Sequence, residues 1–266
     1  PIVQGPMTRV SDRAEFAAAV AESGALPLLA LAQLRGAEAA ELLAATQRLL
    51  AGRPWGVGIL GFLPAELREE QMAALATVQP PFALIAGGRP DQAAPLEARG
   101  IPTYLHAPTA ELLRIFLEQG ARRFVFEGAE CGGHTGPLNG FALWESMVDL
   151  LLHEAPPAAV AELQILFAGG IHDARSAAMI AALAAPLAQR GAASGVLMGT
   201  AYLFTAEAVA CGAIAPAMQE QALACRTTVT LETGRSWESR LNLSKVAVAR
   251  AQIVVLAVLK VLVAGA

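Results

Sequence analysis

The sequence is poor in charged residues and in cysteine, and both shortages restrict what the chain can be. Charged residues make up 16% of its 266 residues, well below the usual share of about a quarter, whereas hydrophobic residues make up 55%. Such a chain has a large buried core and is not a disordered segment. It has three cysteines, Cys131, Cys211 and Cys225, too few and too far apart for a disulfide framework or a Cys-x-x-Cys metal site. We therefore expect reduced thiols in a cytoplasmic protein without a bound metal.

Basic residues are scattered along the chain, and lysine occurs only as Lys245 and Lys260. With a net charge of −4, nothing in the sequence resembles a nucleic-acid-binding surface. The chain opens at Pro1 without a signal peptide, and we expect it to be part of a longer, multidomain chain. The apolar stretch 246–264 is about long enough to cross a bilayer, but its interior cations make insertion costly. We expect a buried or interface helix there and no membrane span.

Eight short apolar runs alternate with segments of helical character. The runs are largely continuous rather than alternating, as expected of parallel strands buried on both faces. A doubly wound open sheet would more often have about five or six strands and a G-x-G-x-x-G turn after the first, and the sequence has neither. We therefore predict a (β/α)8 TIM barrel over residues 1–212 and a C-terminal helical extension over 213–266. The predicted strands cover 1–7, 26–31, 55–60, 82–86, 101–105, 124–126, 163–168 and 195–198.

Capping and breaking residues help to define the predicted helices. Ser11 is expected to cap a helix over 13–23. Pro186 is expected to kink or split the helix predicted over 174–190. After the last strand, 206–226 reads as one helix. The other predicted helices cover 37–51, 66–78, 110–119 and 141–153, with a short helical stretch ending at 99.

Glycines recur at or near the C-terminal ends of the predicted strands. That face carries the active site in barrels of this kind, and the loops after strands seven and eight often bind phosphate. Glycine as a simple turn former explains one or two of these positions but not the repeated placement. We therefore predict a phosphate-bearing ligand near 169–170 and 198–200. The glycines concerned are Gly5, Gly58, Gly61, Gly87, Gly88, Gly128, Gly132, Gly133, Gly169, Gly170 and Gly199.

The stretch 123–137 joins a short apolar strand to a glycine-rich loop that contains His134 and two carboxylates. Glycine lets backbone N–H groups approach a ligand closely, and histidine can change its protonation near neutral pH. A surface turn with an incidental histidine is the alternative interpretation. The placement of the other glycines favours a site, in which His134 is the candidate catalytic residue.

Four segments together resemble the nitronate monooxygenase (2-nitropropane dioxygenase-like) family, whose members are FMN-binding (β/α)8 barrels. The same family includes flavin-dependent enoyl reductases of fatty-acid and polyketide megasynthases. The resemblance extends from Pro1 to about Thr205, and the motifs occur in the family's order. The segments are PIVQGPM at 1–7, GAECGGHTG at 128–136, AGGI at 168–171 and VLMGT at 196–200.

This resemblance implies that the chain binds FMN non-covalently and that His134 is its catalytic histidine, moving a proton at neutral pH. It also implies that Met7 lies against the flavin and that 197–200 hold the phosphate through backbone N–H groups. The residues that it assigns to the cofactor are Met7, Gly58, Glu127, Gly132, Gly133, Gly169, Gly170, Leu197, Met198, Gly199 and Thr200.

The chain departs from the family pattern at three places. Gly58 stands where nitronate monooxygenases usually carry asparagine, and Glu127 stands where they usually carry glutamine. A carboxylate at 127 would disfavour an anionic nitronate and a reduced flavin. The segment 172–194 is also longer than in stand-alone members. These departures resemble the branch embedded in megasynthases, and they bear on the substrate rather than on the cofactor.

The resemblance leads to one principal function and two alternatives. The principal function is that of an FMN-dependent oxidoreductase that oxidises alkyl nitronates with O2, with His134 handling the α-proton. The first alternative is an NADPH-dependent enoyl reductase domain that acts on an enoyl thioester in a polyketide or fatty-acid synthase. The second is an inactive flavin-binding structural domain of a larger assembly.

Two further polar residues near the predicted mouth have open roles. His106 follows a predicted strand, and it either assists substrate binding or is a rim histidine without a role. Glu130 is expected to be a solvated loop carboxylate, with orientation of His134 as the alternative. Surface roles are expected for His153 and His172, with an approach of His172 to the phosphate as its alternative. Packing roles are expected for Trp144 and Trp237.

Overall fold

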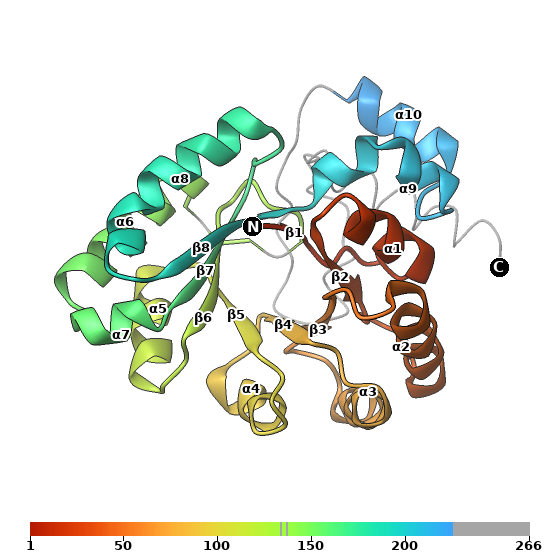
Figure 1. Cartoon of the computed structure of the whole chain (residues 1–266), viewed down its shortest axis with the longest axis horizontal. Helices are drawn as coiled ribbons and strands as arrows, with labels where there is room; N and C mark the ends of the chain where they lie inside the picture. The colour runs from red at the N-terminus through yellow and green to blue at the C-terminus, as the bar shows by residue number, and fades with distance from the viewer. Residues whose placement is uncertain (134, 137, 226–266) are drawn as a thin grey trace, which may run out of the picture.

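The chain folds into a closed barrel of eight parallel strands with helices around it (Figure 1). The computed structural model describes residues 1–133, 135–136 and 138–225. Neighbouring strands pair in chain order, and β8 closes the ring by pairing with β1. The strands are β1 (Ile2–Gln4), β2 (Leu26–Ala30), β3 (Gly56–Leu60), β4 (Phe82–Ala86), β5 (Thr103–Ala107), β6 (Arg123–Glu127), β7 (Gln164–Ala168) and β8 (Ala193–Met198).

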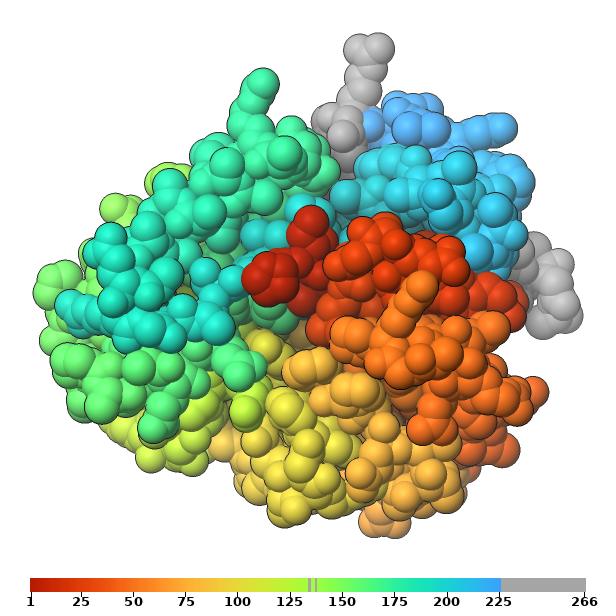
Figure 2. All heavy atoms as spheres, viewed as in Figure 1, coloured from red at the N-terminus to blue at the C-terminus, as the bar shows by residue number. Residues whose placement is uncertain are grey.

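The helices form an outer layer around the barrel. In Figure 2 the start of the chain, in red, is uncovered near the middle of the visible face. A 3-10 helix, η1 (Thr200–Phe204), follows β8. In the part of the chain that the structure describes, no helix is long and apolar enough to span a membrane. The α-helices are α1 (Ala14–Glu22), α2 (Gly36–Leu50), α3 (Ala65–Thr77), α4 (Pro90–Glu97), α5 (Ala110–Glu118), α6 (Gly140–His153), α7 (Pro157–Ala161), α8 (Ala174–Gln189), α9 (Ala206–Ala210) and α10 (Pro216–Ala224).

Each strand lies between two layers of apolar side chains. Outward-pointing residues such as Phe126 and Phe167 pack against the helices in the main core. The residues between them, such as Val125 and Leu166, form a separate cluster inside the barrel. This alternation along each strand explains why the strand sequences are continuously apolar. It also directs every second residue near the C-terminal end of a strand into the mouth of the barrel.

The predicted (β/α)8 barrel is confirmed, but β5 begins at Thr103 rather than at 101. Pro102 has no N–H to donate to a ladder, whereas the Thr103 N–H donates to the Glu97 carboxylate at 2.8 Å. The shift places His106 within β5 and not after it. Its side chain shares the inner face of the strand with Tyr104, which packs against the cluster inside the barrel.

Other local predictions were wrong where tertiary contacts override a local signal. Ser11 does not cap α1, which begins after Arg13; its hydroxyl instead accepts a hydrogen bond from the Met7 N–H at 2.7 Å. Pro186 does not split α8, which runs through it while burying Ile180, Ala184 and Leu187; the other expectation, a kink at this proline, stays a prediction. The proline removes one helical hydrogen bond, but the buried face on either side holds the helix together.

The segment 206–226 was predicted as one helix, and the structure divides it into α9 and α10. Gly212 adopts a left-handed φ of 66°, which ends α9, and Pro216 occupies the first turn of α10. Ile214 and Ala222 share a buried cluster with Phe16 of α1. The domain boundary at 212 stays a prediction, and residues 226–266 lie outside the described residues.

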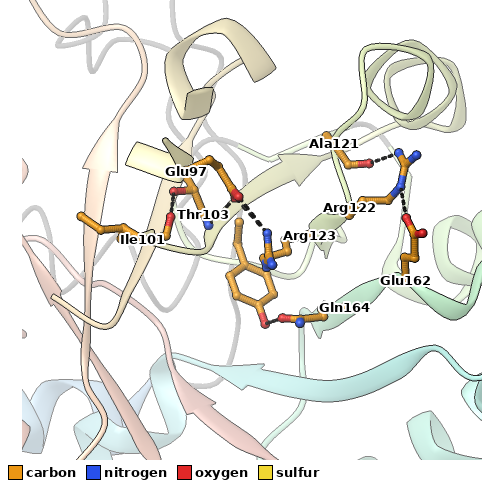
Figure 3. Close-up of polar contacts among 9 residues, drawn as sticks. Glu97, Ile101, Thr103, Ala121, Arg122, Arg123, Glu162 and Gln164 are labelled. Carbon is orange, nitrogen blue, oxygen red and sulfur yellow. Dashed lines mark hydrogen bonds and ion pairs between the residues drawn. The ribbon is translucent and has the colours of Figure 1, made fainter. Parts of the chain in front are cut away.

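A polar cluster lies where β5, β6 and β7 begin, at the opposite end of these strands from the mouth (Figure 3). Glu97, at the end of α4, accepts hydrogen bonds from the Thr103 N–H and, at 3.0 Å, from the Arg123 guanidinium. The Tyr104 hydroxyl donates to the Gln164 side-chain oxygen at 3.0 Å. Burial raises the pKa of Tyr104, although nearby Arg123 lowers it. The cluster joins three adjacent strands below the apolar interior.

Removing the charge of Glu97 should destabilise this end of the barrel. We expect Glu97→Gln to lower the free energy of unfolding by about 1 kcal/mol, because Arg123 loses its charged partner while an oxygen remains for Thr103. The two side chains are 24% and 40% exposed, so the loss should shrink at high salt. Urea unfolding measures the effect. Glu162→Gln, which removes the more exposed partner of Arg122, is the matched control, and an equal loss there would contradict this account.

Candidate active site

The C-terminal ends of the eight strands meet at one mouth, and the residues predicted to bind the cofactor lie at or near it. Elements that are far apart in sequence are neighbours here because the barrel is closed. His134, the predicted catalytic residue, lies outside the described residues. Taken round the barrel from β3 to the chain after β1, the predicted residues are Gly58, Glu127, Gly132, Gly133, Gly169, Gly170, Leu197, Met198, Gly199, Thr200 and Met7.

Glu127 and His106 form a hydrogen-bonded pair inside the mouth. Nδ1 of His106 lies 2.6 Å from Oε2 of Glu127. Their side chains are only 14% and 9% exposed. The pair joins neighbouring strands, because His106 is near the end of β5 and Glu127 is the last residue of β6. A contact this short between an imidazole N–H and a carboxylate is charge-assisted and fixes the orientation of the ring.

The other ring nitrogen of His106, Nε2, is buried. Among the residues that the structure describes, none forms a hydrogen bond with this atom. An unpaired buried polar atom costs about 1–3 kcal/mol. Packing alone therefore does not account for a histidine at this position. From the sequence, His106 either assists substrate binding or has no role. Its pairing with Glu127 was not predicted, because the two residues lie on different strands.

The loop between β6 and α6 is closed at its base by two hydrogen bonds. The Ala129 N–H donates to the Leu138 carbonyl at 2.8 Å, and the Gly140 N–H donates to Oε2 of Glu130 at 2.7 Å. Glu130 is exposed as a residue, as predicted, but its carboxylate holds the first turn of α6. A negative charge at a helix N-terminus is favourable. The segment that carries His134 is thus anchored at both ends.

Cys131 joins the loop after β6 to the loop after β7. A Cβ added at Gly169 would lie 3.5 Å from Sγ of Cys131 and 3.4 Å from Oε2 of Glu130. Burial, followed by the charges of Glu127 and Glu130, raises the pKa of the Cys131 thiol well above its ordinary value. The thiol is therefore a neutral packing group near neutral pH. Gly169 has a φ of 128°, which L-residues rarely adopt.

Met7 and Gly199 lie next to each other although they stand near opposite ends of the barrel sequence. A Cβ added at Gly199 would lie 3.7 Å from Sδ of Met7. Met7 is held in place by Ser11, whose hydroxyl accepts from the Met7 N–H and donates to the Met7 carbonyl at 3.2 Å. The observed role of Ser11 is therefore to fix the loop after β1. The structure brings the predicted flavin-contacting methionine to the predicted phosphate loop.

Packing against another part of the chain explains why position 58 is a glycine, and the neighbouring sequence does not reveal this. A Cβ at this position would lie 2.2 Å from Cβ of Pro6. The ring of Pro6 therefore covers the inner face of β3, and an asparagine at 58 would require Pro6 to move. The absence of an asparagine side chain at position 58 is thus linked to the position of the chain after β1.

Consecutive residues at the end of β8 point to opposite sides. Leu197 packs with the cluster inside the barrel, whereas the side chain of Met198 is buried in the main core. The Met198 carbonyl accepts from the Gly5 N–H at 2.8 Å. Thr200 begins η1, with Gly199 as its N-terminal cap. The side chain of Met198 therefore points away from the mouth, and its carbonyl is bound to the chain after β1.

The glycines at the ends of β6, β7 and β8 fit a phosphate-bearing cofactor such as FMN. A Cβ at Gly133 would have nothing within 4 Å, and one at Gly170 would approach only Glu130, at 3.8 Å. Gly133, Gly169 and Gly170 all have positive φ. Backbone surface is therefore open at these loops, as a ligand held by N–H groups requires. The buried, unpaired Nε2 of His106 lies at the same mouth.

The remaining candidate residues have the minor roles predicted for them. His153 and His172 are exposed, and their Nδ1 atoms contact the carbonyls of Asp149 and Gly170 at 2.8 and 2.7 Å. Trp144 is a packing residue: it contacts Phe167 edge-to-face, and its indole N–H donates to the Phe126 carbonyl. Trp237 lies outside the described residues.

Comparisons with known proteins agree with this geometry. The family described as "NMO: Nitronate monooxygenase" matches residues 66–242. The nitronate monooxygenase of Pseudomonas aeruginosa is 29% identical, and the match covers 89% of this chain and 75% of that protein. The (3aS,4S,5R,7aS)-5-hydroxy-7a-methyl-1-oxo-octahydro-1H-indene-4-carboxyl-CoA dehydrogenase of Rhodococcus jostii is also 29% identical, over 78% of this chain and 53% of that protein. FabK from Thermotoga maritima has the same fold, with a TM-score of 0.69 at 24% identity, over 86% of this chain and 66% of FabK.

The fold is a (β/α)8 barrel whose candidate site lies at the C-terminal ends of the strands. The chain belongs to the nitronate monooxygenase family. Members of this family are flavoproteins. The chain spans about half the length, 53%, of the Rhodococcus relative.

Loss of the Glu130 carboxylate should loosen the start of α6. We expect Glu130→Ala to weaken this helix end by about 1 kcal/mol, because the Gly140 N–H loses its acceptor and the helix loses a favourable charge. Amide hydrogen exchange at Gly140 and its neighbours should become faster. Glu145→Ala, on the exposed face of the same helix, is the control. Unchanged exchange at Gly140 in Glu130→Ala would show that the carboxylate does not hold the loop.

Proposed function

We propose that the chain is an FMN-dependent oxidoreductase that oxidises alkyl nitronates with O2. The observation that carries this proposal is the meeting of Met7, Glu127 and the glycines after β7 and β8 at one mouth of the barrel. The 29% identity to a nitronate monooxygenase over 89% of this chain supports the substrate class. When bound, the flavin supplies the redox chemistry.

The residues of the mouth have separate roles in this proposal. The backbone of Gly169, Gly170 and 197–200 holds the phosphate, because Gly169, Gly170 and Gly199 have no side chain to keep a phosphate away from backbone N–H groups. Met7 lies against the flavin ring, at a position that Ser11 fixes. His134, in the loop anchored by Glu130, handles the α-proton.

Thioester reduction with NADPH is the second candidate. It is favoured by the carboxylate at Glu127 and by the absence of an amide at Gly58, where Pro6 leaves no room for one. A relative whose name specifies a CoA substrate is as similar in identity as the nitronate monooxygenase. In this alternative the same mouth binds an enoyl thioester, and His134 supplies a proton.

Anaerobic reduction of the FMN-loaded protein separates the two candidates. We expect propyl-2-nitronate to bleach the flavin absorbance and NADPH alone to leave it unchanged, because only the nitronate is the proposed electron donor. Absorbance of the flavin after each addition is the measurement. Bleaching by NADPH alone would overturn the nitronate proposal and direct the next assay to an enoyl thioester.

Substitution of Gly199 tests the proposed phosphate site. Gly199→Ala should fold normally, since its Cβ would make only ordinary contacts with Met7 and the glycine φ of −115° suits any residue. The methyl group would occupy space next to the phosphate, so we expect the Kd for FMN to rise roughly tenfold or more. Fluorescence titration with FMN measures this. Ala178→Val, on the exposed side of α8, is the control, and an unaltered Kd in Gly199→Ala would place the phosphate elsewhere.

A further inference from the structure

We propose that His106 is a positioning residue that holds the Glu127 carboxylate and compensates its charge, so that the barrel mouth accepts an anionic ligand. This inference rests on the proposed function, because it takes the mouth around Glu127 as the ligand site. It gives His106 a role in substrate specificity that acts through Glu127 rather than through direct contact with the substrate.

The geometry of the pair supports a dedicated role for His106. The strands that carry the two residues are paired, with His106 opposite Val125, so the 2.6 Å contact is built into the barrel wall. Both side chains are largely buried, and a buried carboxylate needs a partner that supplies positive charge or an N–H dipole. Among the described residues, the Glu127 carboxylate is the only side-chain partner of the His106 ring.

No other basic group in the described part of the chain contacts Glu127. Arg123 shares the inner face of β6, but it lies four residues away, about 13 Å along the strand, and pairs with Glu97. The nearby titratable groups on the loop after β6 are Glu130 and the Cys131 thiol, and neither supplies positive charge. Compensation of the Glu127 charge therefore depends on His106.

The consequence for substrate binding follows from charge. A bare carboxylate in a mouth of low dielectric constant repels a nitronate, which is an anion. The imidazole N–H, or the full positive charge of an imidazolium, reduces that repulsion and holds Oε2 of Glu127 against the His106 ring. The glutamate that stands in place of the family's usual glutamine is thereby made compatible with an anionic substrate.

A double-mutant cycle with an inert anion tests the proposal. Nitrite binding to the FMN-loaded protein, followed by flavin absorbance, should weaken about tenfold in His106→Leu because Glu127 is left unpaired. His106→Asn should stay near wild type, since its amide can still donate to Glu127. His106→Leu combined with Glu127→Gln should recover nitrite binding to within about twofold of Glu127→Gln alone. The Kd for FMN is measured for every variant, so that nitrite binding is compared at saturating FMN.

The outcomes distinguish this proposal from the proposed function. Equal weakening of nitrite binding in His106→Leu with and without Glu127→Gln would overturn the charge compensation and indicate a purely structural role. Unchanged nitrite binding in His106→Leu would also overturn it. His153→Asn, at an exposed site, controls for loss of any histidine. If the nitrite pattern holds but propyl-2-nitronate is not oxidised, the proposed function fails and the role of His106 stands.

A ligand-free measurement keeps the inference testable whatever the cofactor. Histidine 15N NMR of the protein without FMN should show that Glu127→Gln shifts the Nδ1 signal of His106, because the acceptor loses its charge. The signal of His153 should not move, since its ring contacts the Asp149 carbonyl on α6. A His106 signal that is the same in both proteins would show that the pair does not form in solution.

Discussion

The pairing of β8 with β1 is the constraint on which the site depends. It aligns Ile2 with Val196 and Gln4 with Met198, and the Gly5 N–H extends the contact to the Met198 carbonyl. Because the barrel closes, the C-terminal ends of all eight strands open at one mouth, and the loops after the first and last strands become neighbours. That is how Met7 comes to lie beside Gly199, 192 positions away in the chain.

The barrel interior is apolar in its middle and polar at both ends, and each polar end has a different task. Where β5 to β7 begin, Glu97 holds Arg123, and the contacts serve the stability of the fold. At the mouth, His106 holds Glu127, and its Nε2 is left without a described partner. Each cluster contains one buried nitrogen without a described partner, Nε of Arg123 and Nε2 of His106. Position therefore distinguishes them, because only the pair at the mouth lies where barrels of this kind bind ligands.

The pair also changes how the departures from the family pattern are understood. In the sequence, Glu127 is an added negative charge that argues against an anionic substrate. In the structure it is a hydrogen-bonded carboxylate with an imidazole against it. Similarly, Gly58 is in the sequence a position that lacks an amide side chain, whereas in the structure it is the position over which Pro6 packs. Both residues therefore belong to coupled arrangements, and the substrate class follows from the arrangement rather than from either residue alone.

The barrel, its strand order and the placement of glycines at the ends of the strands could all be predicted from the sequence alone. These features follow from local signals: apolar runs of strand length, helix-terminating glycines, and motifs that repeat along the chain. Which side chains contact one another could not be predicted in this way and is known only from the folded structure. The contacts of His106 with Glu127 and of Pro6 with Gly58 join different parts of the barrel, and that of Glu130 with Gly140 spans a loop. They depend on strand register and loop closure, which no local pattern encodes, because moving a strand by one residue turns every side chain to its other face.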